Sequence, residues 1–115
     1  MPKTLTLSEP RLSEIMGVRT VKWDLIDQDG EGYRISWIKR AFDTLKPECM
    51  AFSCKHDERG LRWTNYREQA VSHNPDAALA LNEVMMQLKE KHGYTYNTKA
   101  GFRLLPGEVV ADGYR

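Results

Sequence analysis

The stretch that decides the fold runs from Asn74 to Gly93 and reads NPDAALALNEVMMQLKEKHG. Asn74 is a good helix N-cap, and Pro75 suits the first helical position because no intrahelical bond is lost there. Asp76 favours the positive end of the helix dipole, and the basic residues at the end of the stretch favour the negative end. Gly93 can adopt the left-handed conformation that ends a helix. The pattern therefore predicts one long helix.

The composition indicates one small domain that spans residues 1–115. The chain has 17 basic and 16 acidic residues, which give a net charge of +1. This balance excludes an acidic mimic of nucleic acid. It also provides no strong whole-molecule attraction to DNA, RNA or anionic membranes, although local basic patches stay open.

No apolar run approaches the roughly 20 residues that span a bilayer, and the N-terminus lacks the apolar core of a signal peptide. We therefore expect a cytoplasmic protein without a membrane partner. Cys49 and Cys54 fit reduced, buried thiols better than a disulfide framework. If residues 49–56 form a strand, the two side chains point to opposite faces about 16 Å apart, too far to share a zinc ion. We expect no metal and no cofactor.

Alternation of apolar and polar residues predicts two β-hairpins before the helix. The first hairpin joins a strand at 18–26 to a return strand at 33–37 through a turn cluster at 27–32. The second hairpin joins strands at 49–56 and 61–66. The expected fold is therefore α+β, with an antiparallel sheet of about four strands packed on the long helix in the second half of the chain.

A short N-terminal helix is also expected, over residues 8–16. Ser8 is a suitable cap, and Gly17 is a suitable end. Leu12, Ile15 and Met16 are spaced so that they would give this helix one apolar side.

Three other segments are less regular. Residues 38–46 fit either a short helix or a strand. Residues 67–73 are expected to connect the fourth strand to the main helix. The tail beyond the helix contains Pro106-Gly107, a good turn centre, and adds a hairpin or an edge strand.

Alternation also assigns the two faces of the sheet, although a register error of one residue would exchange them. The face covered by the helix is expected to hold Val21, Trp23, Leu25, Tyr33, Ile35, Trp37, Met50, Phe52, Leu61 and Trp63. The opposite face is expected to hold Thr20, Lys22, Asp24, Arg34, Ser36, Ser53, Lys55, Arg62, Thr64 and Tyr66.

The opposite face suggests a nucleic-acid-binding site, because it combines four basic side chains with an aromatic ring. Basic side chains beside a stacking platform are what single-stranded nucleic acid requires. The competing interpretation is an ordinary solvated sheet face. The residues of this candidate site are Lys22, Arg34, Lys55, Arg62 and Tyr66.

The main helix has an apolar surface wider than one sheet face needs. Leu79, Met85 and Met86 are the candidate partner-binding residues on it, because methionine side chains adapt to many partners. The competing interpretation is that the first helix and the tail cover this surface. A homodimer would also satisfy it.

No catalytic set is recognisable. His56 and His73 are the candidates for acid–base chemistry, but neither is associated with a pocket in the sequence, and no phosphate loop or nucleophile motif is present. The sequence therefore favours a non-enzymatic binding protein that acts by protein–protein contact. A regulator or inhibitor of a larger machine, such as a phage or mobile-element accessory protein, is of this kind. The alternative is a nucleic-acid-binding domain.

Overall fold

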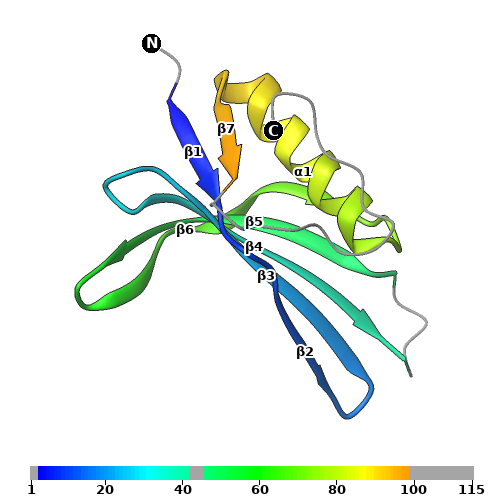
Figure 1. The fold of residues 1–115 in the computed structure, drawn as a ribbon. Coiled ribbons are helices and arrows are strands. Elements are labelled where there is room, and N and C mark those ends of the chain that lie inside the picture. The colour runs from blue at the N-terminus through cyan, green and yellow to red at the C-terminus, as the bar shows by residue number, and fades with distance from the viewer. Residues whose placement is uncertain (1–2, 42–45, 99–115) are drawn as a thin grey trace.

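The computed structural model describes residues 3–41 and 46–98, which form seven strands and one helix (Figure 1). In chain order the elements are β1 (Thr4–Leu7), β2 (Arg11–Ile15), β3 (Val18–Ile26), β4 (Glu31–Arg40), β5 (Glu48–Asp57), β6 (Gly60–Ser72), α1 (Ala77–His92) and β7 (Thr95–Thr98). The sheet order is β6-β5-β4-β3-β1-β7, and β2 pairs with β3 alone. The described part of the chain contains no helix that is long and apolar enough to cross a membrane.

β3 and β4 form the centre of the sheet, and β3 divides its far edge between two partners. β1 pairs with its C-terminal end, at Leu25 and Ile26, whereas β2 pairs with its first five residues. Because β4 covers the whole of the other edge, β1 and β2 follow one another along the same side of β3. β7 then adds to β1 as the single parallel pair among the described strands.

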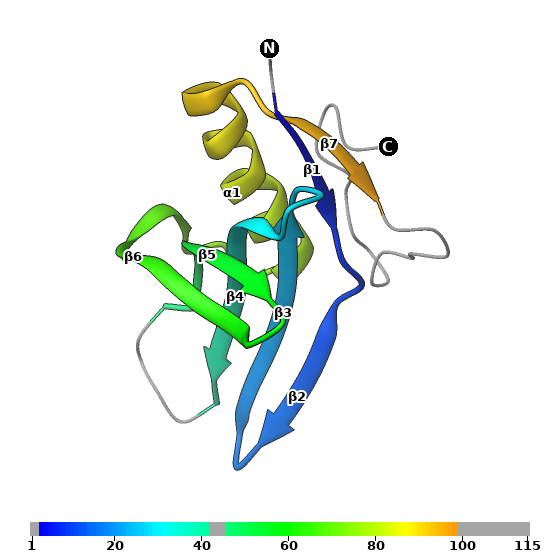
Figure 2. The same cartoon turned by 90° about the vertical axis from the view of Figure 1, so that its left-hand side faces the viewer.

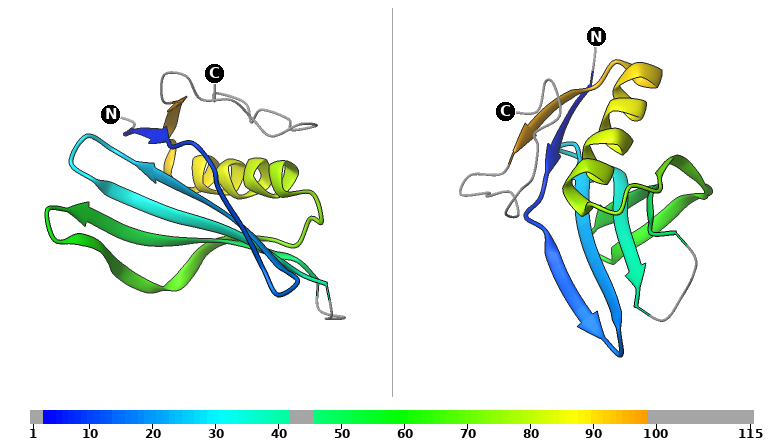
Figure 3. Two further views of the ribbon diagram at one scale, coloured as in Figure 1. Left: turned by 60° about the horizontal axis from the view of Figure 1, so that its bottom comes forward. Right: turned by 90° about the vertical axis from the view of Figure 1, so that its right-hand side faces the viewer.

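The helix packs on one face of this sheet, and no other described element covers the opposite face (Figure 3). β7 is tied to the helix by the Tyr96 hydroxyl, which donates to the Met85 carbonyl at 2.6 Å. The buried core consists of Leu5, Leu7, Val21, Trp23, Leu25, Tyr33, Ile35, Trp37, Cys49, Ala51, Ala70, Ala80, Leu81, Val84, Met85, Leu88 and Tyr96.

The long helix is confirmed, but its predicted N-cap is wrong. Asp76 is the cap, and its carboxylate accepts from the amides of Ala78 and Leu79 at 2.9 and 3.0 Å. Asn74 instead accepts from the Asp76 amide, so the proline between them precedes the helix. Both residue types cap well, and propensity cannot rank two candidates that lie two residues apart. The helix ends at Gly93, whose φ of 73° is left-handed as predicted.

The predicted four-stranded sheet with an N-terminal helix is wrong. Residues 11–15 form β2, which turns into β3 through Met16 and Gly17 at φ of 50° and 79°. Two positive φ values make a two-residue turn that suits a hairpin. Apolar residues at positions 12, 15 and 16 have helical spacing, but no tertiary partner covers them, so the spacing misled the prediction.

The other predicted elements are partly confirmed and partly wrong. The strands predicted at 18–26, 33–37, 49–56 and 61–66 are present, and all except the first are longer than predicted. The predicted connection at 67–73 is wrong, since β6 continues to Ser72 past two register shifts that hide its alternation. Residues 38–40 belong to a strand, whereas 42–45 and the predicted tail hairpin lie outside the described residues.

The face assignment is correct for β3 and β4 and reversed for β5 and β6. Cys49 and Ala51 lie opposite Trp37 and Ile35, so they face the helix. A shift of one residue moves every side chain of a strand to the other face. The residues wrongly placed inside are Met50, Phe52, Leu61 and Trp63.

Candidate binding surfaces

The predicted basic face does not assemble as one patch. Lys22 and Arg34 do lie on the face opposite the helix, where they pair with Ser36 and Asp24 across the strands. Lys55 lies opposite Glu31 and Arg62, which places these residues on the face that carries the helix. The reversed register of β5 therefore divides the predicted nucleic-acid site between the two faces.

Ion pairs also neutralise most of these cations. Lys55 Nζ lies 3.4 Å from Glu31, and Arg62 Nη2 lies 2.6 Å from Asp57. Tyr66 is 83% exposed on the irregular part of β6, away from Arg34 on the central strand.

Asp24 organises the centre of the outer face. Its carboxylate accepts from Arg34 Nε at 2.5 Å and from Arg11 Nη1 at 3.1 Å, and its amide donates to Ser8 Oγ at 2.8 Å. Burial alone would raise the pKa of Asp24, but the hydrogen bonds from the two arginines outweigh it and hold the pKa below its usual value. Arg34, which was predicted to be part of the nucleic-acid site, thus belongs to an ion pair that stabilises the fold.

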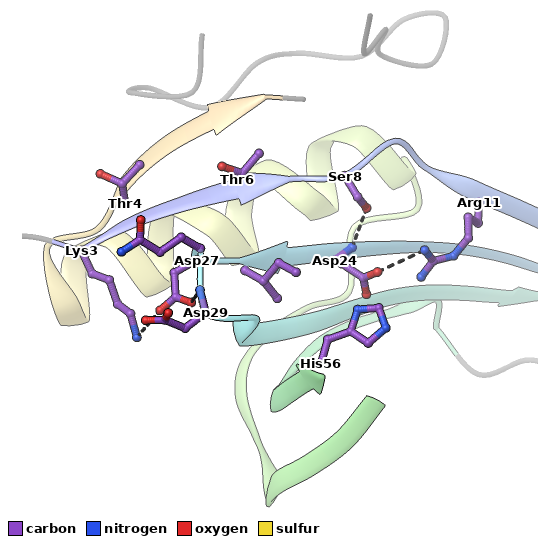
Figure 4. Close-up of a pocket in the computed structure, with 11 residues that line it drawn as sticks. Lys3, Thr4, Thr6, Ser8, Arg11, Asp24, Asp27, Asp29 and His56 are labelled. Carbon is purple, nitrogen blue, oxygen red and sulfur yellow. Dashed lines mark hydrogen bonds and ion pairs between the residues drawn. The ribbon is translucent and has the colours of Figure 1, made fainter. Parts of the chain in front are cut away.

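An open cavity of about 860 Å³ lies beside this pair, between β1 and the β3–β4 turn (Figure 4). Hydroxyl side chains of β1 line one side, and His56 lies at the other. Two of its three acidic residues are already engaged, since Asp24 binds the two arginines and Asp27 binds Lys3 Nζ at 2.8 Å and also accepts from the amides of Asp29 and Glu31. The lining therefore has mixed charge, with acidic, basic and hydroxyl side chains together.

The apolar surface predicted on the helix is mostly core. Met85 is fully buried, Met86 is partly buried against the core, and Leu79 is 36% exposed. β1 and β7 supply core residues beside the helix. The tail, to which β7 belongs, was expected to cover this surface, whereas the N-terminal helix expected beside it is wrong and β1 was not predicted. Of the three predicted partner-binding residues, only Leu79 is substantially exposed.

The histidines and cysteines do not form a reactive cluster. His56 lies opposite Leu61, whereas His73 follows the residue opposite Cys49, so they are roughly 23 Å apart at the usual strand rise. Cys49 and Cys54 are free and buried on opposite faces, and burial raises their pKa values to about 12 and about 11. No group of three or more metal-ligating side chains occurs among the described residues.

Three of the six exposed large apolar residues among the described residues lie on the β2–β3 hairpin, and the sequence interpretation missed this hairpin. All five residues of β2 are exposed, and the hairpin extends beyond the end of the helix (Figure 2). Leu12, Ile15 and Met16 are 60%, 66% and 87% exposed. Residues 11–15 do not alternate between apolar and polar, so the glycine after Met16 was the one local signal that favours a tight turn here.

The free edge of β2 is also less protected than that of β6. β6 is interrupted by bulges, and Gln87 of the helix covers its edge at Val71, donating to the carbonyl at 2.8 Å and accepting from the amide at 3.2 Å. These are the devices that proteins use to block edge pairing. Within the described chain, β2 pairs with β3 only and has neither device.

Residues 11–22 of the β2–β3 hairpin and residues 36–41 at the end of β4 form one arm of the molecule, and this arm is basic. It contains five basic side chains and a single acid, Glu14. The five basic residues are Arg11, Arg19, Lys22, Lys39 and Arg40. Since the whole chain has a net charge of +1, its positive charge is concentrated on this arm.

Comparisons of the chain with protein-family models, curated proteins and solved structures found no match.

Proposed function

We propose that this protein is a non-enzymatic binding module that accepts an extended segment of a partner protein along the free edge of β2. The exposed β2–β3 hairpin is the observation that carries the proposal. A strand edge offers a row of backbone donors and acceptors, and a partner strand satisfies them while side chains on both faces give specificity. A regulator or inhibitor of a larger assembly would work in this way.

Met16 supports this proposal independently of the edge. Its φ of 50° lies in the left-handed region, where asparagine or glycine is normal, and it is the most exposed large apolar residue described. Neither turn geometry nor core packing favours methionine at this position. An outlier that local structure does not explain is a reason to suspect a functional contact.

Site-specific photo-crosslinking in native host lysate tests the proposal. A photoreactive phenylalanine analogue replaces Ile15 in one variant and Leu79 in a matched control on the helix. We expect the Ile15 variant to crosslink one protein in nuclease-treated lysate, and Met16→Asn to reduce that product. Crosslinking from the helix position alone would move the binding surface back to Leu79 and Met86 and overturn the proposal.

A second candidate function is nucleic-acid binding by the arm, because its five basic residues surround an apolar hairpin tip. A two-stranded ribbon fits the major groove of DNA, and apolar side chains can wedge between base steps. Gel retardation at two salt concentrations tests this candidate. The double variant Arg19→Gln/Lys39→Gln should lose binding that the control Lys55→Gln/Arg62→Gln retains. No retardation at low salt would remove the candidate.

A further inference from the structure

We infer that the strand accepted by β2 belongs to a different protein, not to β2 of a second copy, and carries a basic side chain opposite Glu14 and an acidic one opposite Arg11. This inference rests on the proposed function. It follows from the charges that β2 presents to an added strand.

The cross-strand register sets each residue of β2 beside one residue of β3, which in turn lies beside one residue of β4. Glu14, Arg19 and Lys39 lie side by side on the face of the helix, and Glu14 lies 3.7 Å from Arg19 as an exposed ion pair. On the opposite face, Arg11 adjoins Lys22, and although it also binds Asp24 at 3.1 Å, its side chain stays 52% exposed at the edge. Residues directly opposite one another share a face, and like charges there destabilise the pairing. An added strand therefore needs a cation beside Glu14 and an anion beside Arg11.

The apolar positions extend the same pattern. Leu12 adjoins Val21 and Trp37 in the next row on the helix face, and Ile15 adjoins Val18 on the other face. Both leucine and isoleucine are more than half exposed at present, so an apolar neighbour would remove their surfaces from water. In an antiparallel partner, five successive side chains lie opposite Ile15, Glu14, Ser13, Leu12 and Arg11. These side chains are then apolar, basic, polar, apolar and acidic, in that order.

A second copy of β2 cannot supply this pattern in a symmetric antiparallel pair. Arg11 and Glu14 point to opposite faces, so no such register sets one against the other. Pairing about Ser13 sets Leu12 against Glu14. Pairing about Glu14 sets two carboxylates against each other, and pairing about Leu12 leaves both charges without a counter-charge. Each arrangement disfavours self-association through this edge.

Two synthetic peptides of identical composition test the inference. The matched peptide is Thr-Val-Lys-Thr-Val-Asp-Thr, and in the swapped peptide the lysine and the aspartate exchange places. Each is titrated at low salt into the isotope-labelled protein while the amide resonances of β2 are followed by NMR. We expect the matched peptide to bind about fivefold to tenfold more tightly, because two exposed charge pairs change sign.

The variant Glu14→Lys provides the decisive comparison, because each peptide then makes one attractive and one repulsive charge pair with β2. The preference for the matched peptide should therefore disappear in this variant, and an undiminished preference would overturn the charge rule. Equal binding of both peptides to both proteins, with shifts confined to β2, would overturn the charge rule while strand acceptance stands. Absence of any β2 shift with either peptide at millimolar concentration would overturn strand acceptance itself, and with it the proposed function. Self-association of the free protein through β2 amides would overturn the choice of a different partner.

Discussion

At the scale of single residues, Asp24 shows how an apparently functional charge becomes structural. Its side chain is only 10% exposed, and two arginines compensate it. A buried carboxylate needs such partners, because its desolvation is costly. Arg34 therefore stabilises the fold, so its substitution would change the free energy of unfolding before it changed any binding.

We predict that Asp24→Asn lowers the free energy of unfolding at pH 7 by about 2 kcal/mol, because two charge-assisted hydrogen bonds weaken. Since the folded-state pKa of Asp24 is lowered, its contribution is complete above the unfolded pKa of about 3.9 and is lost as pH falls through the folded pKa. Urea unfolding between pH 7 and pH 3 measures this. The difference from wild type should shrink on acidification, whereas the exposed control Asp29→Asn should differ little at any pH.

The helix cap provides a second prediction at this scale. Asp76→Ala should cost about 1 kcal/mol, because two backbone amides of the first turn lose their acceptor. Asp76→Asn keeps an acceptor and should stay within about 0.5 kcal/mol of wild type. Thermal unfolding of both variants measures the difference, and equal stabilities would show that another residue caps the helix.

At the scale of elements, the sheet edges differ in how they are protected. Gln87 makes a reciprocal pair of hydrogen bonds with the backbone of Val71, so the helix closes the β6 edge without adding a strand. β2 has the opposite character, since its edge and its apolar side chains are both open. This contrast, more than hydrophobicity alone, is the reason that we propose β2 as the binding edge.

We expect Gln87→Met, which keeps the side-chain length and removes both hydrogen bonds, to destabilise the protein by about 1 kcal/mol. The Val71 amide should exchange with solvent at least several-fold faster, as measured by hydrogen exchange. The same substitution at Gln28, on the exposed β3–β4 turn, is the matched control. Unchanged exchange at Val71 would mean that the helix does not protect this edge.

At the scale of the whole molecule, stability should be unevenly distributed. The core lies between α1 and the covered face of the sheet, whereas the β2–β3 arm projects beyond the helix (Figure 2). Segments with few buried contacts open locally at low free-energy cost. We predict that amides of β2 exchange first and those around Trp23 and Ile35 last, in native-state hydrogen exchange. Uniform protection would mean that the arm is covered in solution.

Local sequence determined those elements whose signals lie within the element itself. The helix 77–92 and its glycine end follow from periodicity and end signals, and the hairpin of β3 and β4 follows from alternation around a turn cluster. Their inward residues, such as Trp23, Ile35 and Trp37, were identified correctly because both strands are regular. These features depend on neighbours within about twenty positions.

The tertiary structure alone decided the features that depend on distant partners. β1 and β7 are four-residue strands whose pairing joins the two ends of the described chain, and this pair turned the apolar helix surface into core. Residues 12, 15 and 16 have helical spacing, yet pairing with β3 made them an exposed hairpin. A side chain's periodicity records which neighbours along the chain share its face. It does not record whether anything packs on that face, because that free energy comes from contacts between segments far apart in the sequence.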